Sequence, residues 1–187
     1  MVQCETRAEW RAWLEANHAT ATGAWLVTWR NDTGHPVLDY EAGVEEALCF
    51  GWIDSRGGRL DEQRSKLYYA SRKPRSGWAR TNKARVERLV AAGQMAPAGL
   101  AAIERAKANG SWTMLDDVEN LVVPDDLGAA LEASPPARDH WEAFPPSERR
   151  MTLEWIRQAR RPETRSARIA TAVDRAVRKE RINQGRG

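Results

Sequence analysis

A change of hydrophobic periodicity at residues 71–78, SRKPRSGW, limits the folds open to this chain more than any other feature. Before this break, the side chains of residues 23–30 (GAWLVTWR) alternate with the two-residue period of a β-strand. After it, the apolar side chains of residues 78–92 recur with the 3.6-residue period of a helix. Pro74 lacks a backbone donor and fixes its own φ, so neither kind of element runs through it. The chain therefore joins a sheet-forming segment to a helical one.

Three strands and two helices are expected before the break. Each helix follows a residue whose side-chain oxygen can accept a hydrogen bond from a free backbone N–H: Thr6, which forms a capping box with Glu9, and Asp39. The polar, glycine-rich stretch RGGRLDEQR is expected to be an exposed loop or hairpin. The expected strands are 23–30, 51–55 and 65–71, and the expected helices are 6–17 and 39–50.

Everything after the break is helical in pattern. Proline residues open several of the expected segments, as is typical of the first turn of a helix. We therefore predict an α+β fold with a small N-terminal part of about three strands and two helices, residues 1–75, followed by a mainly α-helical half, residues 76–187. The two parts form one compact unit or two closely packed subdomains. The tail from Arg178 onward is expected to fray. The expected helices of this half begin near Trp78, Pro97, Pro124, Pro136, Ser147 and Pro162.

The composition is compatible with a folded, soluble protein. Nine tryptophans among 187 residues supply large apolar surfaces for a core, although only 42% of the residues are hydrophobic. The two cysteines, Cys4 and Cys49, form no CxxC pair, which argues against a disulfide framework or a zinc site. Neither an 18-residue apolar run nor a signal leader occurs, so the sequence predicts a cytoplasmic protein without membrane insertion.

Charge is strongly segregated along the chain. Residues 1–55 carry 3 basic and 9 acidic side chains, and residues 56–107 carry 13 and 4. The pattern repeats, because residues 108–146 carry 1 and 8, and residues 147–187 carry 12 and 5. We expect the acidic and basic blocks to fold against each other, since a dedicated nucleic-acid binder usually keeps its excess charge uncompensated.

Known catalytic and cofactor motifs are missing. The sequence contains no GxGxxG, GxxxxGK[ST], GxSxG or HExxH, so nucleotide cofactors, serine hydrolysis and zinc proteolysis lack their signatures. His18, His35 and His140 have no metal-type spacing to each other or to a cysteine. Cys49 lies between Leu48 and Phe50 and is interpreted as a buried apolar side chain. No cofactor and no metal are expected.

Residues with binding chemistry cluster between positions 50 and 83. Basic and aromatic side chains beside the start of a helix suit an anion, because free amides and the helix dipole add to the guanidinium charge. A carboxylate at the end of a strand can hydrogen-bond a ligand or bind an amine. The alternative is purely structural, with the arginines paired to N-terminal acids and Trp78 in the core. The candidate ligand-binding residues are Trp52, Asp54, Arg72, Arg75, Ser76, Trp78 and Asn82.

Four stretches together resemble the YdeI/OmpD-associated, or bacteriocin-protection (OmdA-like), family: EALCFGWIDS, RKPRSGWARTNKARVERLVAAGQMAPAGLAAIERAKANGSW, VPDDLGAAL and RRMTLEWIRQARRPETRSARIATAV. The resemblance extends from the helix of Trp10 to about Val177. It implies a role in bacterial tolerance of antimicrobial peptides or bacteriocins. Ser55, Ala79 and Ala96 depart from the family pattern, and each lost hydroxyl cap, at Ala79 and at Ala96, costs about 1 kcal/mol.

Three functional hypotheses follow. The first is a cytoplasmic stress- or antimicrobial-tolerance protein that binds a small molecule or peptide at the Trp- and Arg-lined junction. The second is a nucleic-acid-binding regulator that uses its basic helices. The third is an enzyme with Asp54 as general base and arginine stabilising an oxyanion. The sequence lacks a nucleophile or cofactor signature and so favours the first, and it leaves the ligand and the oligomeric state open.

Overall fold

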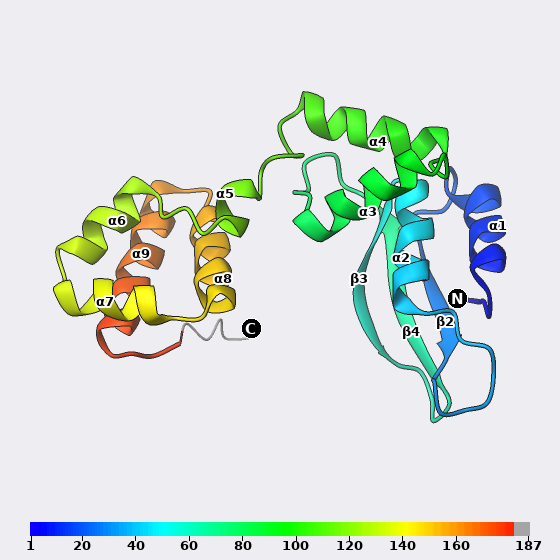
Figure 1. Cartoon of the computed structure of the whole chain (residues 1–187), viewed down its shortest axis with the longest axis horizontal. Helices are drawn as coiled ribbons and strands as arrows, with labels where there is room; N and C mark the ends of the chain where they lie inside the picture. Colours follow the sequence, from blue (N-terminus) through cyan, green and yellow to red (C-terminus); the bar gives the residue numbers. More distant parts are fainter. Residues whose placement is uncertain (182–187) are drawn as a thin grey trace. The chain divides into compact units, whose positions relative to one another are not determined.

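The computed structural model describes residues 1–181 and divides into two units, Met1–Met114 (unit 1) and Leu115–Gly187 (unit 2) (Figure 1). Unit 1 contains β1 (Val2–Gln3), α1 (Arg7–Asn17), β2 (Gly23–Trp29), α2 (Tyr40–Cys49), β3 (Trp52–Arg59), β4 (Arg64–Ser71), α3 (Arg80–Ala91) and α4 (Pro97–Ala108). Unit 2 contains α5 (Asp116–Glu119), α6 (Asp125–Glu132), α7 (Pro135–Ala143), α8 (Pro146–Arg157) and α9 (Pro162–Val177). The predicted α+β class is confirmed.

The sheet of unit 1 has the strand order β1-β2-β4-β3. The three expected strands are present, and the short β1 adds a fourth that pairs in parallel with β2. Strands β3 and β4 form an antiparallel hairpin that takes in the RGGR sequence, the polar stretch expected to be a loop or hairpin. The register shifts between Asp54 and Gly57, which is a β-bulge.

The core of unit 1 lies on one face of this sheet. Trp10 of α1 contacts the ring of Tyr69 on β4 at 5.3 Å between centroids, and it stacks on Trp13 at 5.2 Å. Trp52 at the start of β3 meets Trp13 edge-on. The indole Nε1 of Trp10 also donates to the Gly43 carbonyl of α2, so the polar atom of this buried ring is satisfied. Helices α1 and α2 therefore cover the face of the sheet that carries Tyr69.

A buried carboxylate joins α1 to α2. Glu46 is only 3% exposed and accepts hydrogen bonds from Arg7 Nε and, at 2.8 Å, from Arg11 Nη1. Arg11 also donates to the Gln94 carbonyl in the segment before α4. A carboxylate is retained at this depth because two guanidinium groups compensate its lost hydration.

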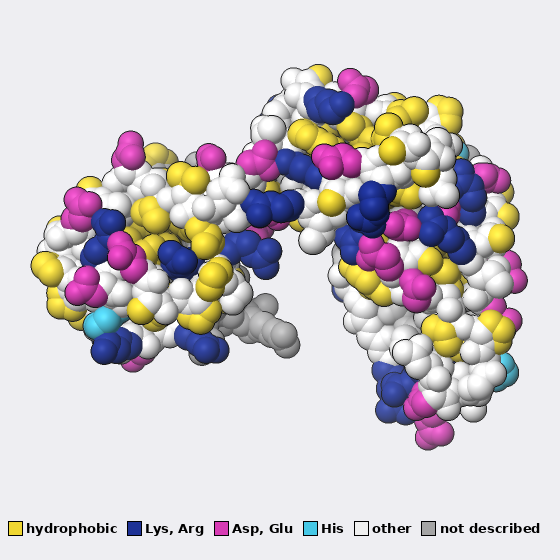
Figure 2. Space-filling model, in the orientation of Figure 1, with side chains coloured by type: hydrophobic (Ala, Val, Ile, Leu, Met, Phe, Trp, Pro, Cys, Tyr) yellow, Lys and Arg dark blue, Asp and Glu magenta, His cyan; other side chains and the backbone are white. Residues whose placement is uncertain are grey.

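Ion pairs in each unit link an acidic block of the sequence to a basic one. In unit 1, Arg85 and Arg88 of α3 pair with Glu41 and Glu45 of α2, with contacts of 2.5 to 3.3 Å. Figure 2 shows the resulting mixture of basic and acidic side chains over α2 and α3. In unit 2, Arg165 of α9 pairs with Asp126 of α6.

Close backbone contact sets the position of α4. A Cβ atom on Gly99 would lie 2.2 Å from the carbonyl oxygen of Cys49, the last residue of α2. The same carbonyl accepts a hydrogen bond from the backbone N–H of Ala96, just before α4. Gly51 turns the chain between α2 and β3 with a φ of +72°, a conformation that favours glycine. Helix α4 therefore approaches the end of α2 at a distance that only glycine permits.

Unit 2 has its own core, built from α5 to α9. Trp141, Leu127, Leu131 and Ile156 are each no more than 2% exposed. His140 of α7 contacts the Ala176 carbonyl of α9 through Nδ1 at 2.8 Å, which joins the two helices beside this core.

The boundary between the two units differs from the expected division at residue 75. Helices α3 and α4 belong to unit 1, because Trp78, Val86, Leu89 and Ile103 share one apolar cluster with the sheet and α1. The hydrophobic period changes at the break, but the compact unit continues to Met114. The end of the tail, residues 182–187, where fraying is expected, lies outside the described residues.

We predict that Gly99→Ala destabilises unit 1 by about 1–3 kcal/mol, because the added methyl group must displace the Cys49 carbonyl or the helix. Gly58→Ala in the same unit is the matched control, since a Cβ there meets nothing within 4 Å. Urea denaturation followed by circular dichroism measures both. Equal stabilities of the two variants would show that α4 does not pack as closely as described.

We also predict that Glu46→Gln lowers the unfolding free energy by about 3 kcal/mol, because two arginines lose the charge that compensates them. Glu15→Gln removes a carboxylate that also pairs with Arg11 but is 58% exposed, so its effect should stay within about 0.5 kcal/mol. Chemical denaturation of both variants makes the comparison, and a small loss for Glu46→Gln would contradict the role given to this carboxylate.

Candidate functional site

The arginine at the sheet-to-helix break is buried against a tryptophan. The Arg72 guanidinium carbon lies 3.9 Å from the centroid of the Trp78 ring, and Trp78 is 2% exposed. Arg72 Nη2 donates to the Gly77 carbonyl at 2.7 Å, whereas its buried Nε has no hydrogen-bond partner in the described part of the chain. Burial lowers the pKa of Arg72 to about 10, and the nearby Asp54 charge opposes this shift. The candidate residues Arg72 and Trp78 thus contact each other, and the cation is only partly satisfied.

Asp54 lies on the helix-covered face of the sheet, opposite Tyr69. Its Oδ2 accepts a hydrogen bond from the Tyr40 hydroxyl at 3.1 Å. Burial and the Asp54 charge raise the pKa of Tyr40, and the same two causes raise the pKa of Tyr69. Burial, and secondarily the Asp54 charge, therefore favour the neutral, proton-donating form of both phenols.

The remaining predicted residues have different surroundings. Asn82 accepts a hydrogen bond from Arg85, which pairs with Glu41. Ser76 donates to the Lys73 carbonyl and closes the turn. Arg75 is exposed, and Trp52 is 1% exposed within the core. The structure thus places Arg72 against Trp78 with the Asp54 charge nearby, whereas Asn82 belongs to the Arg85 and Glu41 pair and Trp52 to the core.

The hollow beside Arg72 is small. The hollow has a volume of about 10 Å³, close to that of one water molecule. Its charged lining is entirely basic and consists of Arg72, Lys73 and Arg105, so it suits a single anionic group rather than a whole ligand. The other lining residues are Pro74, Trp78, Ala102 and Ala106.

No three histidine, cysteine, aspartate or glutamate side chains within residues 1–181 are grouped as metal ligands would be. None of the described helices is long and apolar enough to cross a membrane. Both cysteines are free and buried, and burial raises the pKa of the Cys49 thiol, so this thiol is a poor nucleophile.

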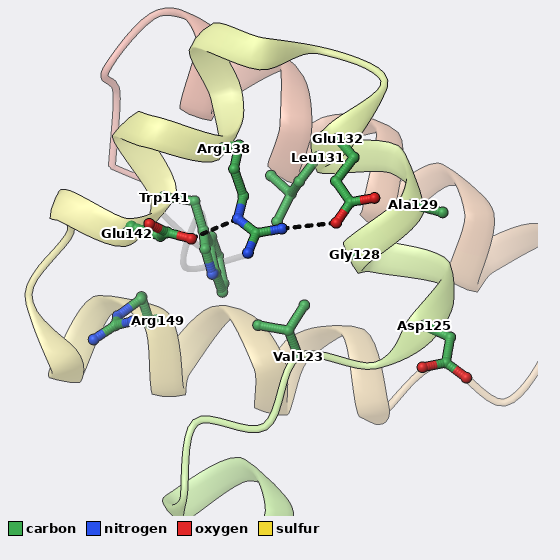
Figure 3. A pocket seen from close by; sticks show the side chains of 10 residues that line it. All are labelled: Val123, Asp125, Gly128, Ala129, Leu131, Glu132, Arg138, Trp141, Glu142 and Arg149. Carbon is green, nitrogen blue, oxygen red and sulfur yellow. Dashed lines mark hydrogen bonds and ion pairs between the residues drawn. The ribbon is translucent and has the colours of Figure 1, made fainter.

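A larger cavity occurs in unit 2. Its volume of about 460 Å³ lies in the range of small-molecule sites. Figure 3 shows the Trp141 indole in the middle of the lining residues, between Arg138 above and Val123 below. The lining residues are Val123, Asp125, Gly128, Ala129, Leu131, Glu132, Arg138, Trp141, Glu142 and Arg149.

Some polar groups that line this cavity have ion-pair partners, whereas others have no hydrogen-bond partner. Arg138 is held between Glu132 at 3.0 Å and Glu142 at 2.5 Å, as the dashed lines of Figure 3 mark. In contrast, Trp141 Nε1 and Arg149 Nε are buried without a hydrogen-bond partner among the described residues. Two donors are therefore left over at the cavity, while its two glutamates already have a cation.

Sequence reasoning missed this cavity. The stretch PPARDHWEAF gives no sign that the Trp141 N–H lacks a partner, because that depends on how α6, α7 and α8 pack. The only sequence signal is a tryptophan between charged residues after a proline-initiated helix, a combination that also occurs in ordinary cores.

Comparison with known families gives two matches. Residues 2–102 match the family described as Domain of unknown function (DUF8412). Residues 120–179 match the family described as Bacteriocin-protection, YdeI or OmpD-Associated. The resemblance expected from the sequence is thus confirmed, over a narrower range than residues 10–177. No curated protein and no solved structure matches the chain significantly.

We predict that Arg72→Met leaves the unfolding free energy unchanged or raises it by about 1 kcal/mol. A folded-state pKa below the ordinary value means that burial disfavours the charged form, and this penalty is present below about pH 10 and relieved above it. Arg85→Met, which breaks the pair with Glu41, should instead cost about 1 kcal/mol. Denaturation at pH 7 compares them. A large loss for Arg72→Met would assign this guanidinium a structural role.

Proposed function

We propose that this chain is an antimicrobial-tolerance protein that binds a small molecule or peptide. It belongs to the DUF8412 family over residues 2–102 and to the bacteriocin-protection, YdeI or OmpD-associated family over residues 120–179. The cavity of unit 2 is the binding site that the geometry favours, because its lining residues, 123–149, lie within the bacteriocin-protection match. The cytoplasm is the proposed compartment, since two buried free thiols suit a reducing environment.

The unpaired indole N–H of Trp141 carries this proposal. An unsatisfied buried donor costs about 1–3 kcal/mol, so such groups are rare in native proteins and call for an explanation. Trp141 is 2% exposed and lines the cavity. A ligand acceptor atom in the cavity would supply the missing hydrogen bond.

Charge selects the class of ligand. Glu132 and Glu142 pair with Arg138, whereas Arg149 and Asp125, the other charged lining residues, form no ion pair among the described residues. Asp125 lies at the end of the cavity away from Trp141 (Figure 3), so donors outnumber free acceptors only at the end that holds Trp141 and Arg149. A carboxylate beside apolar atoms satisfies both Trp141 and Arg149 while filling the Val123 and Leu131 side of the cavity. The peptide carboxyl terminus and small aromatic or acyl carboxylates have this chemistry.

The junction of unit 1 stays a second proposed contact. Arg72, Lys73 and Arg105 can hold one anionic group, although about 10 Å³ excludes a larger ligand there. The basic helices are less suited to nucleic acid, because Arg85, Arg88 and Arg165 already pair with carboxylates. Asp54 as a general base remains a hypothesis, with Tyr40 as its hydrogen-bond partner.

We predict that Trp141→Phe weakens binding of N-acylated dipeptides or aromatic carboxylates by about tenfold, because it keeps the ring and removes only the N–H. Trp155→Phe is the matched control, since Trp155 lies in the same unit but does not line the cavity. Isothermal titration calorimetry measures both. If Trp141→Phe binds as tightly as the wild-type protein, the indole N–H is not a ligand contact.

Tolerance itself is tested in cells. A strain that lacks this gene should become more sensitive to cationic antimicrobial peptides or bacteriocins, and the wild-type gene should restore growth. Arg149→Ala should restore less than Arg150→Ala, a neighbouring exposed arginine that does not line the cavity. Equal rescue by both variants would separate tolerance from the cavity.

A further inference from the structure

The sheet of unit 1 has a second face that its helices leave uncovered. The apolar cluster shared with the helices takes Leu26 from β2 and Tyr69 from β4. Neighbouring side chains on a strand point to opposite faces, so Trp25 and Tyr68 lie on the other side. Neither belongs to that cluster, and both are only half-buried.

Aromatic and basic side chains form paired rows on this face. Trp25 of β2 lies opposite Tyr68 of β4, with ring centroids 5.2 Å apart. Trp29 lies opposite Arg64, and Lys66 occupies the position between Arg64 and Tyr68. Lys66 Nζ lies 4.9 Å from the centre of the Trp25 ring.

The β-bulge adds a third cation. Because Ser55 and Arg56 together oppose Tyr68, the bulge lets Arg56 reach over this face. Its guanidinium carbon lies 5.4 Å from the ring centres of both Trp25 and Tyr68. Arg56 and Lys66 form no ion pair among the described residues, so both charges are available to a ligand.

We infer that this face, defined by Trp25, Trp29, Arg56, Lys66 and Tyr68, binds single-stranded nucleic acid. Aromatic side chains on an open sheet stack two or three unpaired bases, and flanking cations neutralise the phosphates between them. Trp25 and Trp29 are four residues apart on one strand, which corresponds to about 13 Å. His35 stacks on the Trp29 ring at 3.9 Å between centroids and Arg64 lies 5.8 Å from the same ring, so the rings left for bases are those of Trp25 and Tyr68.

Charge complementarity selects this occupant over a second copy of the chain. Two such faces pressed together would bring Arg56 and Lys66 against their own counterparts, and like charges in an interface cost affinity. At the other end of the face, Glu5 accepts from Trp29 Nε1 and Asp61 pairs with Arg64, so these carboxylates are already engaged. The uncompensated charge of the face is therefore positive and lies around Trp25.

The expected salt dependence of binding follows from the number of cations on this face that have no ion pair. Two phosphate contacts on a single strand give a slope of log affinity against log salt of roughly −1.4, which indicates a modest, salt-sensitive association. This surface differs from the basic helices, and it is independent of the cavity proposed in unit 2. Loss of one activity should therefore leave the other intact.

Fluorescence anisotropy with a labelled 12-nucleotide deoxythymidylate at 50 mM NaCl tests the inference. We expect micromolar binding by the full chain and about tenfold weaker binding by the double variant R56Q/K66Q. The control R88Q/K107Q also removes two positive charges from unit 1, on exposed positions of α3 and α4, and should bind like the wild-type protein. Trp25→Leu should weaken binding by about tenfold through lost stacking.

Three results would overturn the inference. They are no binding of the oligonucleotide by the wild-type chain, equal losses for R56Q/K66Q and R88Q/K107Q, or a dimer in solution that R56Q/K66Q alters. Circular dichroism checks folding of each variant. If Trp25→Leu fails to fold, the two charge-removing variants still decide the question, because they leave the buried core unchanged.

Discussion

The position of α1 on α2 depends on one buried carboxylate, and the rest of unit 1 depends on that position. Glu46 holds Arg7 and Arg11 at once, which fixes the helix that carries Trp10 and Trp13 over the sheet. Because α1 and α2 lie on that face of the sheet, the helices of unit 1 leave its other face uncovered. The arrangement that builds the core thus also creates the aromatic and basic surface on the opposite side.

Compensation of charge is the second organising constraint. Each unit joins an acidic block of sequence to a basic one, as the pairs of Arg85 with Glu41 and of Arg165 with Asp126 show. Against this background, the cations that remain without a carboxylate partner are informative. Arg56 and Arg149 are two of these cations, and each shares its surface with a tryptophan, on the open sheet face or in the cavity.

Local chemistry could be predicted from the sequence, whereas features that depend on packing could not. The cap at Thr6 and the start of α9 at Pro162 follow from one or two residues, and the structure has both where the sequence places them. The candidate residues Arg72 and Trp78 lie within seven residues of each other, and the structure places the guanidinium over the indole ring. The unpaired N–H of Trp141 was not, since it results from three helices meeting around it. The bulge that directs Arg56 likewise depends on register with β4.

The two family matches and the two compact units divide the chain in the same region. The first match ends at residue 102 and the second begins at residue 120, and the units separate between Met114 and Leu115. Each unit has an apolar cluster of its own, so each can be stabilised by its own contacts. The bacteriocin-protection match therefore bears on the cavity of unit 2 and not on the sheet of unit 1. Because each surface belongs to one unit, the ligand of each can be sought separately.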